Sequence, residues 1–242
     1  MTTDKITLIS SFATDRLFDK NNNFIREQKG GPAFFASNVF KKMKLPYSII
    51  PSPKITVDII LRGRNEFGKT KSYSALEIDY KNINTPYLFI SSILNEFSLK
   101  NVSKYKGKIF LDAQGFVRKA GEFGKKKNWN TRKEVENLIS CLKVADYELP
   151  YLKKSFVKKQ KERILLLTQG AKGCTIYAFG KSFFVKSRKI IKTQEALGAG
   201  DTFFAYFISQ YTITKDAYKS ASYATDKTSD FLVSKLHHNQ SL

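Results

Sequence analysis

The chain has 242 residues, and 42% of them are apolar, including 20 Phe and 12 Tyr, which argues against wholesale disorder and allows one large domain. Its formal net charge is +21, a field that attracts nucleic acid, acidic membrane surfaces and phosphorylated small molecules alike. The lysines are scattered, however, and no stretch combines basic residues with aromatics as nucleic-acid modules do. We therefore do not expect nucleic acid as the partner.

Neither end of the chain carries a signal for a membrane or a metal. No apolar stretch approaches the roughly 20 residues that span a bilayer, and the first ten residues carry an acid where a secretory signal would be basic. We expect a cytoplasmic protein with no membrane partner. Cys141 and Cys174 are expected to be reduced, mostly buried thiols, and the adjacent His237 and His238 to lie in a polar tail.

The first part of the chain predicts a strand, a polar hairpin or loop, and a helix. Residues 5–12 form a short apolar run of strand length, and the polar residues 19–31 end in a double glycine. Pro32 suits the first position of a helix, and apolar residues recur at i, i+4 and i+8 from Phe35. A short strand follows at 45–53, broken by two prolines.

The middle of the chain predicts a second hairpin and then buried strands. Residues 55–62 and 70–79 are β-branched or alternating and are predicted to pair across the segment GRNEFGK. Residues 87–94 and 107–115 are nearly continuous apolar runs, typical of parallel strands buried on both faces. Residues 132–146 predict an amphipathic helix that runs into another strand.

The last third predicts three strands and two helices. Residues 162–185 read as a buried strand, a glycine turn and two more strands, and residues 202–212 and 215–236 read as helices. Buried strands that alternate with helices predict an α/β fold with a mostly parallel sheet and helices on both faces. We expect one domain over residues 1–242, with lid strands from about 12–30 and 55–80.

The segment GAGD, Gly198 to Asp201, stands directly before the first of these two helices. Small residues let backbone N–H groups approach an oxyanion, and the helix N-terminus adds partial positive charge. Asp201 could then accept a proton from an attacking hydroxyl, an arrangement that suits phosphoryl transfer. The same four residues could also be a simple helix cap, since Asp is favoured there. This segment is not the GxxxxGK[ST] phosphate loop, and no GxGxxG follows a strand anywhere in the chain.

GAGDTF, together with KGGPAFFASNVF at 29–40 and LTQGAKG at 167–173, resembles the ribokinase-like (PfkB-type) family of carbohydrate and nucleoside kinases. SSILNEF at 91–97 and LDAQGFVRK at 111–119 look most like its archaeal and inositol-kinase-like branch. The resemblance implies a three-layer α/β/α sandwich with a small β lid. It also implies Mg²⁺-dependent transfer of the terminal phosphate of a nucleotide, with ATP expected, to a hydroxyl of a sugar, cyclitol or nucleoside.

The resemblance also implies roles for individual residues. Asp201 would be the base, and the backbone amides of Gly198, Ala199 and Gly200 would form the anion hole. The residues expected to bind the acceptor are Asp15, Gly30, Gly31, Asn38, Gln114 and Arg118. Thr168, Gly170 and Gly173 would line the nucleotide.

Several of these residues have structural alternatives. Asp15 could be a turn residue, Asn38 could cap or pack within its helix, and Arg118 could be solvated surface. Gly170 and Gly173 could belong to an ordinary hairpin turn.

The sequence also departs from the family pattern at two places. EALGAGD puts Glu195 and Ala196 where the family has Asp and Thr, and the NxxE motif is missing, with Glu148 and Tyr151 near the expected positions. No metal ligand can be assigned. A second function therefore stays open: a catalytically degenerate, kinase-like module that senses a nucleotide or contacts nucleic acid through its charge. Pairing of two copies through the lid strands is a further prediction.

Overall fold

The computed structural model describes residues 6–62, 65–188, 191 and 196–239. Glu195 and the side chains of His237 and His238 lie outside the described part, so the predictions for them are untested.

An eight-stranded sheet forms the centre of the molecule, in the order β12-β11-β10-β9-β8-β7-β1-β4. Strands β4 to β10 of that order run parallel, whereas β11 and β12 are antiparallel additions at one edge. Several of these strands are apolar throughout and buried on both faces, as the continuous apolar runs predicted. The strands are β1 Ile6–Ser10, β4 Tyr47–Pro51, β7 Tyr87–Ser91, β8 Lys108–Asp112, β9 Ile139–Ala145, β10 Ile164–Thr168, β11 Gly173–Ala178 and β12 Lys181–Lys186.

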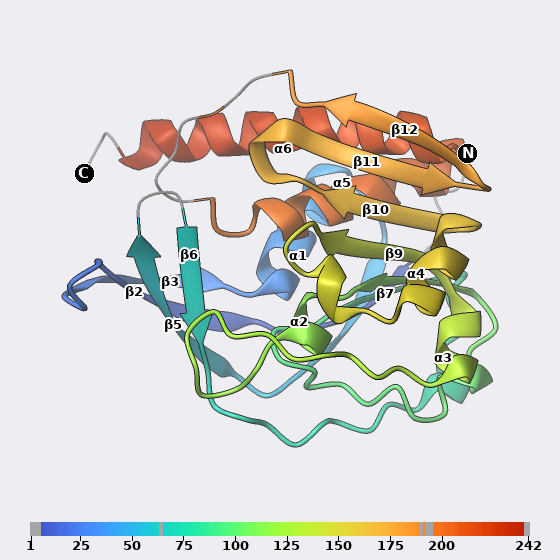
Figure 1. Cartoon of the computed structure of the whole chain (residues 1–242), viewed down its shortest axis with the longest axis horizontal. Helices are drawn as coiled ribbons and strands as arrows, with labels where there is room; N and C mark the ends of the chain where they lie inside the picture. Colours follow the sequence, from blue (N-terminus) through green and yellow to red (C-terminus); the bar gives the residue numbers. More distant parts are fainter. Residues whose placement is uncertain (1–5, 63–64, 189–190, 192–195, 240–242) are drawn as a thin grey trace.

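Helices cover both faces of this sheet (Figure 1). One face packs into a core with α1 Pro32–Lys42, α5 Ala199–Thr214 and α6 Ala217–Asn239. The other face packs into a second core with α2 Gln114–Val117, α3 Lys133–Leu138 and α4 Lys154–Lys161. Helix α5 lies between the sheet and α6, which explains why its sequence is apolar all round. The predicted α/β fold with a mostly parallel central sheet is confirmed.

A second sheet of four strands, in the order β3-β2-β5-β6, stands at one side of the molecule (Figure 1). Its strands are β2 Ala13–Phe18, β3 Phe24–Gly30, β5 Ile55–Arg62 and β6 Asn65–Lys69. Alternate residues of β2 (Ala13, Asp15 and Leu17) are buried, so this strand turns one face inward. We call these four strands the small sheet; it stands where the lid was expected.

One predicted element is wrong in its extent. The strand predicted at 70–79 lies instead at 65–69, inside the segment predicted as its connection. Within 70–79, Leu76 exchanges backbone hydrogen bonds with residues 96 and 98, so its pairing partner is another part of the chain. The helix that runs into a strand, predicted within 132–146, is present as α3 followed directly by β9.

Helix α4 was not predicted from the sequence. It is rich in lysine and buries only Phe156 and Gln160, too few apolar positions for a recognisable period. Cys141 and Cys174 are free and buried, as expected. None of the helices in the described ranges has the length and apolar character that crossing a bilayer demands.

Candidate active site

A cavity of about 850 Å³ lies between the small sheet, the carboxyl ends of the parallel strands and the start of α5. Eleven of the residues predicted from the sequence line it: Asp15, Gly31, Gln114, Arg118, Thr168, Gly170, Gly173, Gly198, Ala199, Gly200 and Asp201. Binding sites in parallel α/β sheets lie at this edge, because the loops that leave the strand ends meet there. The fold thus brings together segments from both ends of the chain.

Asn38 and Gly30 are the two predicted residues that do not line the cavity, and Asn38 lies away from it altogether. Asn38 is exposed on α1, whereas its neighbours Phe35 and Val39 are buried. Successive helical residues are about 100° apart, so Asn38 cannot share the inward face that these residues occupy. Phe35, which the sequence analysis used only as a mark of the helix, lines the cavity in its place.

The turn before α5 adopts a conformation that requires glycine. Gly198 has φ 80°, and a Cβ there would lie 2.2 Å from the ring of Phe35. The N–H of Ala199 donates to the carbonyl oxygen of Ala196 at 3.0 Å, so it is not available to a ligand, contrary to expectation. Among the described residues, no acceptor takes the N–H groups of Gly198, Gly200 or Asp201. The amide of Asp201 therefore replaces that of Ala199 in the candidate anion hole.

The carboxylate of Asp201 is held at the cavity wall by a side-chain amide. Gln114 Nε2 donates to Asp201 Oδ1 at 2.9 Å. Burial raises the pKa of Asp201, while the positive charges of Lys143 and Arg118 and the Gln114 hydrogen bond oppose that rise. A carboxyl with a raised pKa is a stronger base than an ordinary aspartate.

Lys143, on β9, lies beneath this turn and was missed by the sequence analysis. Its ammonium is 2.8 Å from Asp112 Oδ2, and both side chains are almost wholly buried. A Cβ on Gly200 would lie 3.0 Å from Lys143 Nζ, so the positive charge of Lys143 lies directly next to the candidate anion hole. A charged residue inside the apolar run ISCLKVA was the available signal, because a buried lysine needs a partner.

The buried charges interact closely enough to perturb one another. Burial raises the pKa of Asp112 to about 6, although Lys143 opposes the rise. Burial alone would lower the pKa of Lys143, but the carboxylates of Asp112, Glu148 and Asp201 outweigh it and hold that pKa above its usual range. Lys143 therefore stays charged at neutral pH.

Glu148 belongs to this group, near the position where the NxxE motif was sought. It is buried, and its carboxylate accepts the N–H of Ala145 at 3.0 Å. Tyr151 instead packs against the core on the α3 and α4 side of the sheet. Only the glutamate of the two residues thus acts on the buried charges, although it does not line the cavity.

Arg118 is not a solvated surface residue. It is half-buried on the cavity wall, and its guanidinium donates to Gln114 Oε1 at 3.1 Å and to the carbonyl oxygen of Ile93 at 3.3 Å. The buried Glu96 fixes that loop by accepting the N–H groups of Ile93 and Leu94 at 2.8 and 2.6 Å. The SSILNEF segment therefore shapes the wall next to Arg118.

The turn at Gly170 and Gly173 closes the opposite end of the cavity. Gly173 has φ 123°, and a Cβ there would lie 2.1 Å from the carbonyl oxygen of Val185. The turn also joins the antiparallel strands β10 and β11. The geometry is therefore compatible both with a nucleotide-binding turn and with an ordinary hairpin turn.

Asp15 lies on β2 rather than in a turn and is buried against Gly30 of the neighbouring strand. Gly30 does not line the cavity, but a Cβ there would lie 1.8 Å from Asp15 Oδ2. The glycine thus leaves the space in which the Asp15 carboxylate sits.

We predict that Gly30→Ala displaces this carboxylate and raises the acceptor KM about tenfold in steady-state kinetics, because the added methyl overpacks the site. The donor KM should not change. The matched control is Gly68→Ala on β6, where the new methyl would only touch Val57 at 3.5 Å. Equal acceptor KM values for the two variants would show that Asp15 does not bind the acceptor.

The described residues contain no group of three or more His, Cys, Asp or Glu side chains placed to hold a metal ion. A Mg²⁺ bound mainly through phosphates needs only one or two protein carboxylates. Asp146, exposed on the cavity wall after β9, is placed to supply one.

The structure thus combines a three-layer α/β/α body, a small four-stranded sheet and a half-buried acid, Asp201, at the start of α5. Residues 133–234 match the model of the pfkB family carbohydrate kinases. This match covers the segment that contains the GAGD turn and the LTQGAKG segment, two of the motifs on which the resemblance rests.

Solved structures of ribokinase-family proteins share the fold over nearly the whole chain. A pyrophosphate-dependent ribokinase-family kinase in complex with a pyrophosphate analogue and myo-inositol is 19% identical, with a TM-score of 0.70 and 93% of each chain covered. Methanocaldococcus jannaschii nucleoside kinase is 19% identical (TM-score 0.65, covering 96% of this chain and 98% of that one). Thermotoga maritima ribokinase is 13% identical (TM-score 0.67, 92% and 90%). No curated protein matches the sequence.

Proposed function

We propose that the protein transfers the terminal phosphate of a nucleotide to a hydroxyl of a sugar, cyclitol or nucleoside. The observation that carries this proposal is the position of the Asp201 carboxylate. It lies on the wall of an open cavity, held by Gln114, in the same turn as amides that have no acceptor among the described residues. With both in one turn, the base can activate the attacking hydroxyl while the anion hole stabilises the phosphoryl group that is transferred.

The proposed role of each residue follows from its position in the cavity. Asp15 and Arg118 would bind and orient the acceptor, so that one hydroxyl faces Asp201. Asp201 Oδ would take the proton of that hydroxyl as its oxygen attacks the phosphorus atom. The N–H groups of Gly198, Gly200 and Asp201, with the charge of Lys143 beneath Gly200, would stabilise the transferring phosphoryl group.

The donor would lie against Thr168, Gly170 and Gly173, opposite Thr225 and Ser229 of α6. We propose ATP with Mg²⁺, held by the donor phosphates and Asp146; the metal would neutralise charge on those phosphates. Some structural neighbours are pyrophosphate-dependent kinases, so pyrophosphate is the second donor to test. The site would work in the cytoplasm on soluble substrates, and two copies could pair through the small sheet.

The alternative is a kinase-shaped module that binds a nucleotide or nucleic acid without turnover. The formal charge of +21 favours it, as does the absence of the NxxE motif. The buried charges of Asp112, Lys143 and Glu148 beside Asp201 favour the enzyme, because such charges are costly to keep in a protein that only binds.

The test is to incubate the purified protein with Mg²⁺, either ATP or pyrophosphate, and myo-inositol, ribose, fructose or a nucleoside. We expect donor consumption that depends on one class of acceptor, with a new phosphate ester in the ³¹P NMR spectrum. Donor binding without any acceptor-dependent turnover would favour the sensing module. Nucleic-acid binding that weakens steeply with added salt would favour the module that contacts nucleic acid.

A further inference from the structure

Residues 118–127, which we call the basic loop, form a hairpin-like segment that closes one side of the cavity. The loop carries five basic side chains and one acid. Its two arms pair at Arg118 and Lys126, and the N–H of Lys119 donates to the carbonyl oxygen of Lys125 at 2.9 Å. Residues directly opposite each other in an antiparallel pair project to the same side, and their chain neighbours project to the other.

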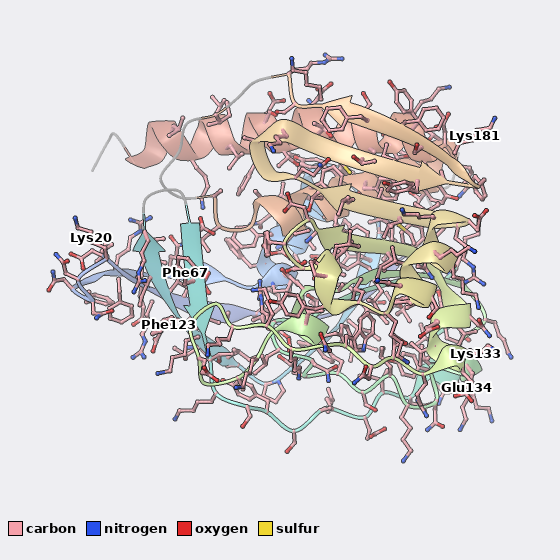
Figure 2. The ribbon with its side chains drawn as sticks, in the orientation of Figure 1. Lys20, Phe67, Phe123, Lys133, Glu134 and Lys181 are labelled. Carbon is pink, nitrogen blue, oxygen red and sulfur yellow. The ribbon has the colours of Figure 1, made fainter. Side chains whose placement is uncertain are left out.

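The tip of the basic loop is fastened to the small sheet. The N–H groups of Gly121 and Gly124 donate to the carbonyl oxygens of Thr70 and Gly68 at 2.9 and 3.1 Å. Gly124 also lies against the ring of Phe67, and Figure 2 shows Phe67 and Phe123 where the loop meets β6. The loop is therefore positioned by both the small sheet and the body of the protein.

The two sides of the loop differ in how their charges are compensated. On one side, the ammonium groups of Lys119 and Lys125 lie 2.5 and 2.9 Å from the two carboxylate oxygens of Glu122. On the other side, Arg118 and Lys126 are half-buried, and neither has a carboxylate within ion-pair distance among the described residues. All four side chains line the cavity, so the difference lies in the compensation of their charges. Their hydrogen-bond acceptors are neutral: Ile93 O and Gln114 Oε1 for Arg118, and Gly124 O for Lys126.

Asp201 and Glu148 act on these two cations only from beyond ion-pair distance. Two neighbouring cations in a partly desolvated wall, with no carboxylate in direct contact, favour an anionic ligand. Burial and the charge of Arg118 lower the pKa of Lys126, and a bound anion would reverse that effect. Arg118 donates a hydrogen bond to Gln114, and Gln114 donates one to Asp201. An anion bound by Arg118 would therefore be separated from the proposed base by the side chain of Gln114.

We propose that Arg118 and Lys126 form a phosphate-binding subsite that holds a second phosphate group during the reaction. This proposal rests on the proposed phosphotransferase function and narrows its substrates. The phosphate belongs either to the donor, as the leaving phosphate of pyrophosphate or a nucleotide, or to an acceptor that is already phosphorylated. Both sources offer a dianion with acceptor oxygens that match a guanidinium and an ammonium.

The test compares Lys126→Met with Lys127→Met, its exposed neighbour, which does not line the cavity. Binding of pyrophosphate, ATP, ribose and ribose 5-phosphate is measured by calorimetry, so that no turnover is needed. We expect Lys126→Met to weaken at least one phosphate-bearing probe about tenfold, because a charge-assisted hydrogen bond is lost. Lys126→Arg should bind that probe almost as the parent does, and Lys127→Met should match the parent.

The probes also separate the two sources. If Lys126→Met binds pyrophosphate more weakly, and ATP competes with pyrophosphate for the parent protein, the subsite belongs to the donor. If Lys126→Met binds ribose 5-phosphate more weakly but ribose equally well, and ATP does not compete with ribose 5-phosphate, the subsite belongs to the acceptor. Equal affinities of Lys126→Met and Lys127→Met for every probe overturn the proposal. Phosphate binding that depends on Lys126 without turnover on any acceptor would support the subsite while contradicting the kinase activity.

Discussion

Replacing Asp201 by Asn should lower kcat by about 10²- to 10⁴-fold while donor binding persists, because the amide cannot accept the proton of the acceptor hydroxyl. The asparagine oxygen can still take the hydrogen bond from Gln114 Nε2, so the geometry of the turn should survive. The variant also removes a half-buried carboxyl group whose charge is disfavoured by its burial, so we expect no loss of thermal stability.

Single-turnover kinetics with saturating donor would measure this effect directly. The matched control is Asp230→Asn, an equal change of charge at an exposed position on α6. If Asp201→Asn turns over at the rate of Asp230→Asn, Asp201 is not the base and the proposed mechanism fails.

Replacing Lys143 by Met should have the largest effect on stability. The substitution leaves the Asp112 carboxyl buried without its ion pair, and removal of one partner from such a pair costs about 3–5 kcal/mol. The loss should grow with pH. With Lys143 gone, the pKa of Asp112 rises further above its unfolded value, so stability is retained at low pH and lost as the pH rises through the folded pKa.

Urea unfolding at pH 5 and pH 8 would test this sign, with the exposed Lys154→Met as control. The double variant Asp112→Asn/Lys143→Met should recover most of the stability, since neither charge is then left alone. A loss that is equal at both pH values would contradict the buried ion pair.

The same variant should also change the pH profile of the reaction. The charge of Lys143 lowers the pKa of Asp201, so its removal should raise that pKa and move the acidic limb of kcat to higher pH. This shift should persist in the double variant even after stability is restored. An unmoved limb would mean that Lys143 acts on the fold alone.

The sequence predicted the fold well because its strands and helices carry strong local signals. The apolar runs at β7 and β8, the proline at the start of α1 and the order of the glycine motifs each specify one part of the architecture. The strand at 65–69 was missed because its identity depends on what it packs against. Phe67 meets Gly124, some 57 positions along the chain, and no local pattern reports such a contact.

The site was predictable where a residue type is tied to one backbone conformation. Gly198 and Gly173 both have positive φ and close neighbours. The motifs that contain them therefore correspond to backbone turns that require glycine. The pair of Asp112 and Lys143 was missed because the sequence shows each as an isolated charge. Asp112 stands at the end of one apolar strand, and Lys143 stands within another. Their partnership arises only when β8 and β9 lie side by side and put residues 112 and 143 in register.

The cavity is assembled from two sheets that do not share a strand. The face of β5 that carries Val57 and Ile59 forms one wall, and the turn at Gly198 and the end of β9 form the other. Under the proposed function, residues of the small sheet that would distinguish one alcohol from another can therefore diverge without altering the turn that would hold the phosphate. A protein built this way can exchange its acceptor over evolutionary time and keep its reaction unchanged.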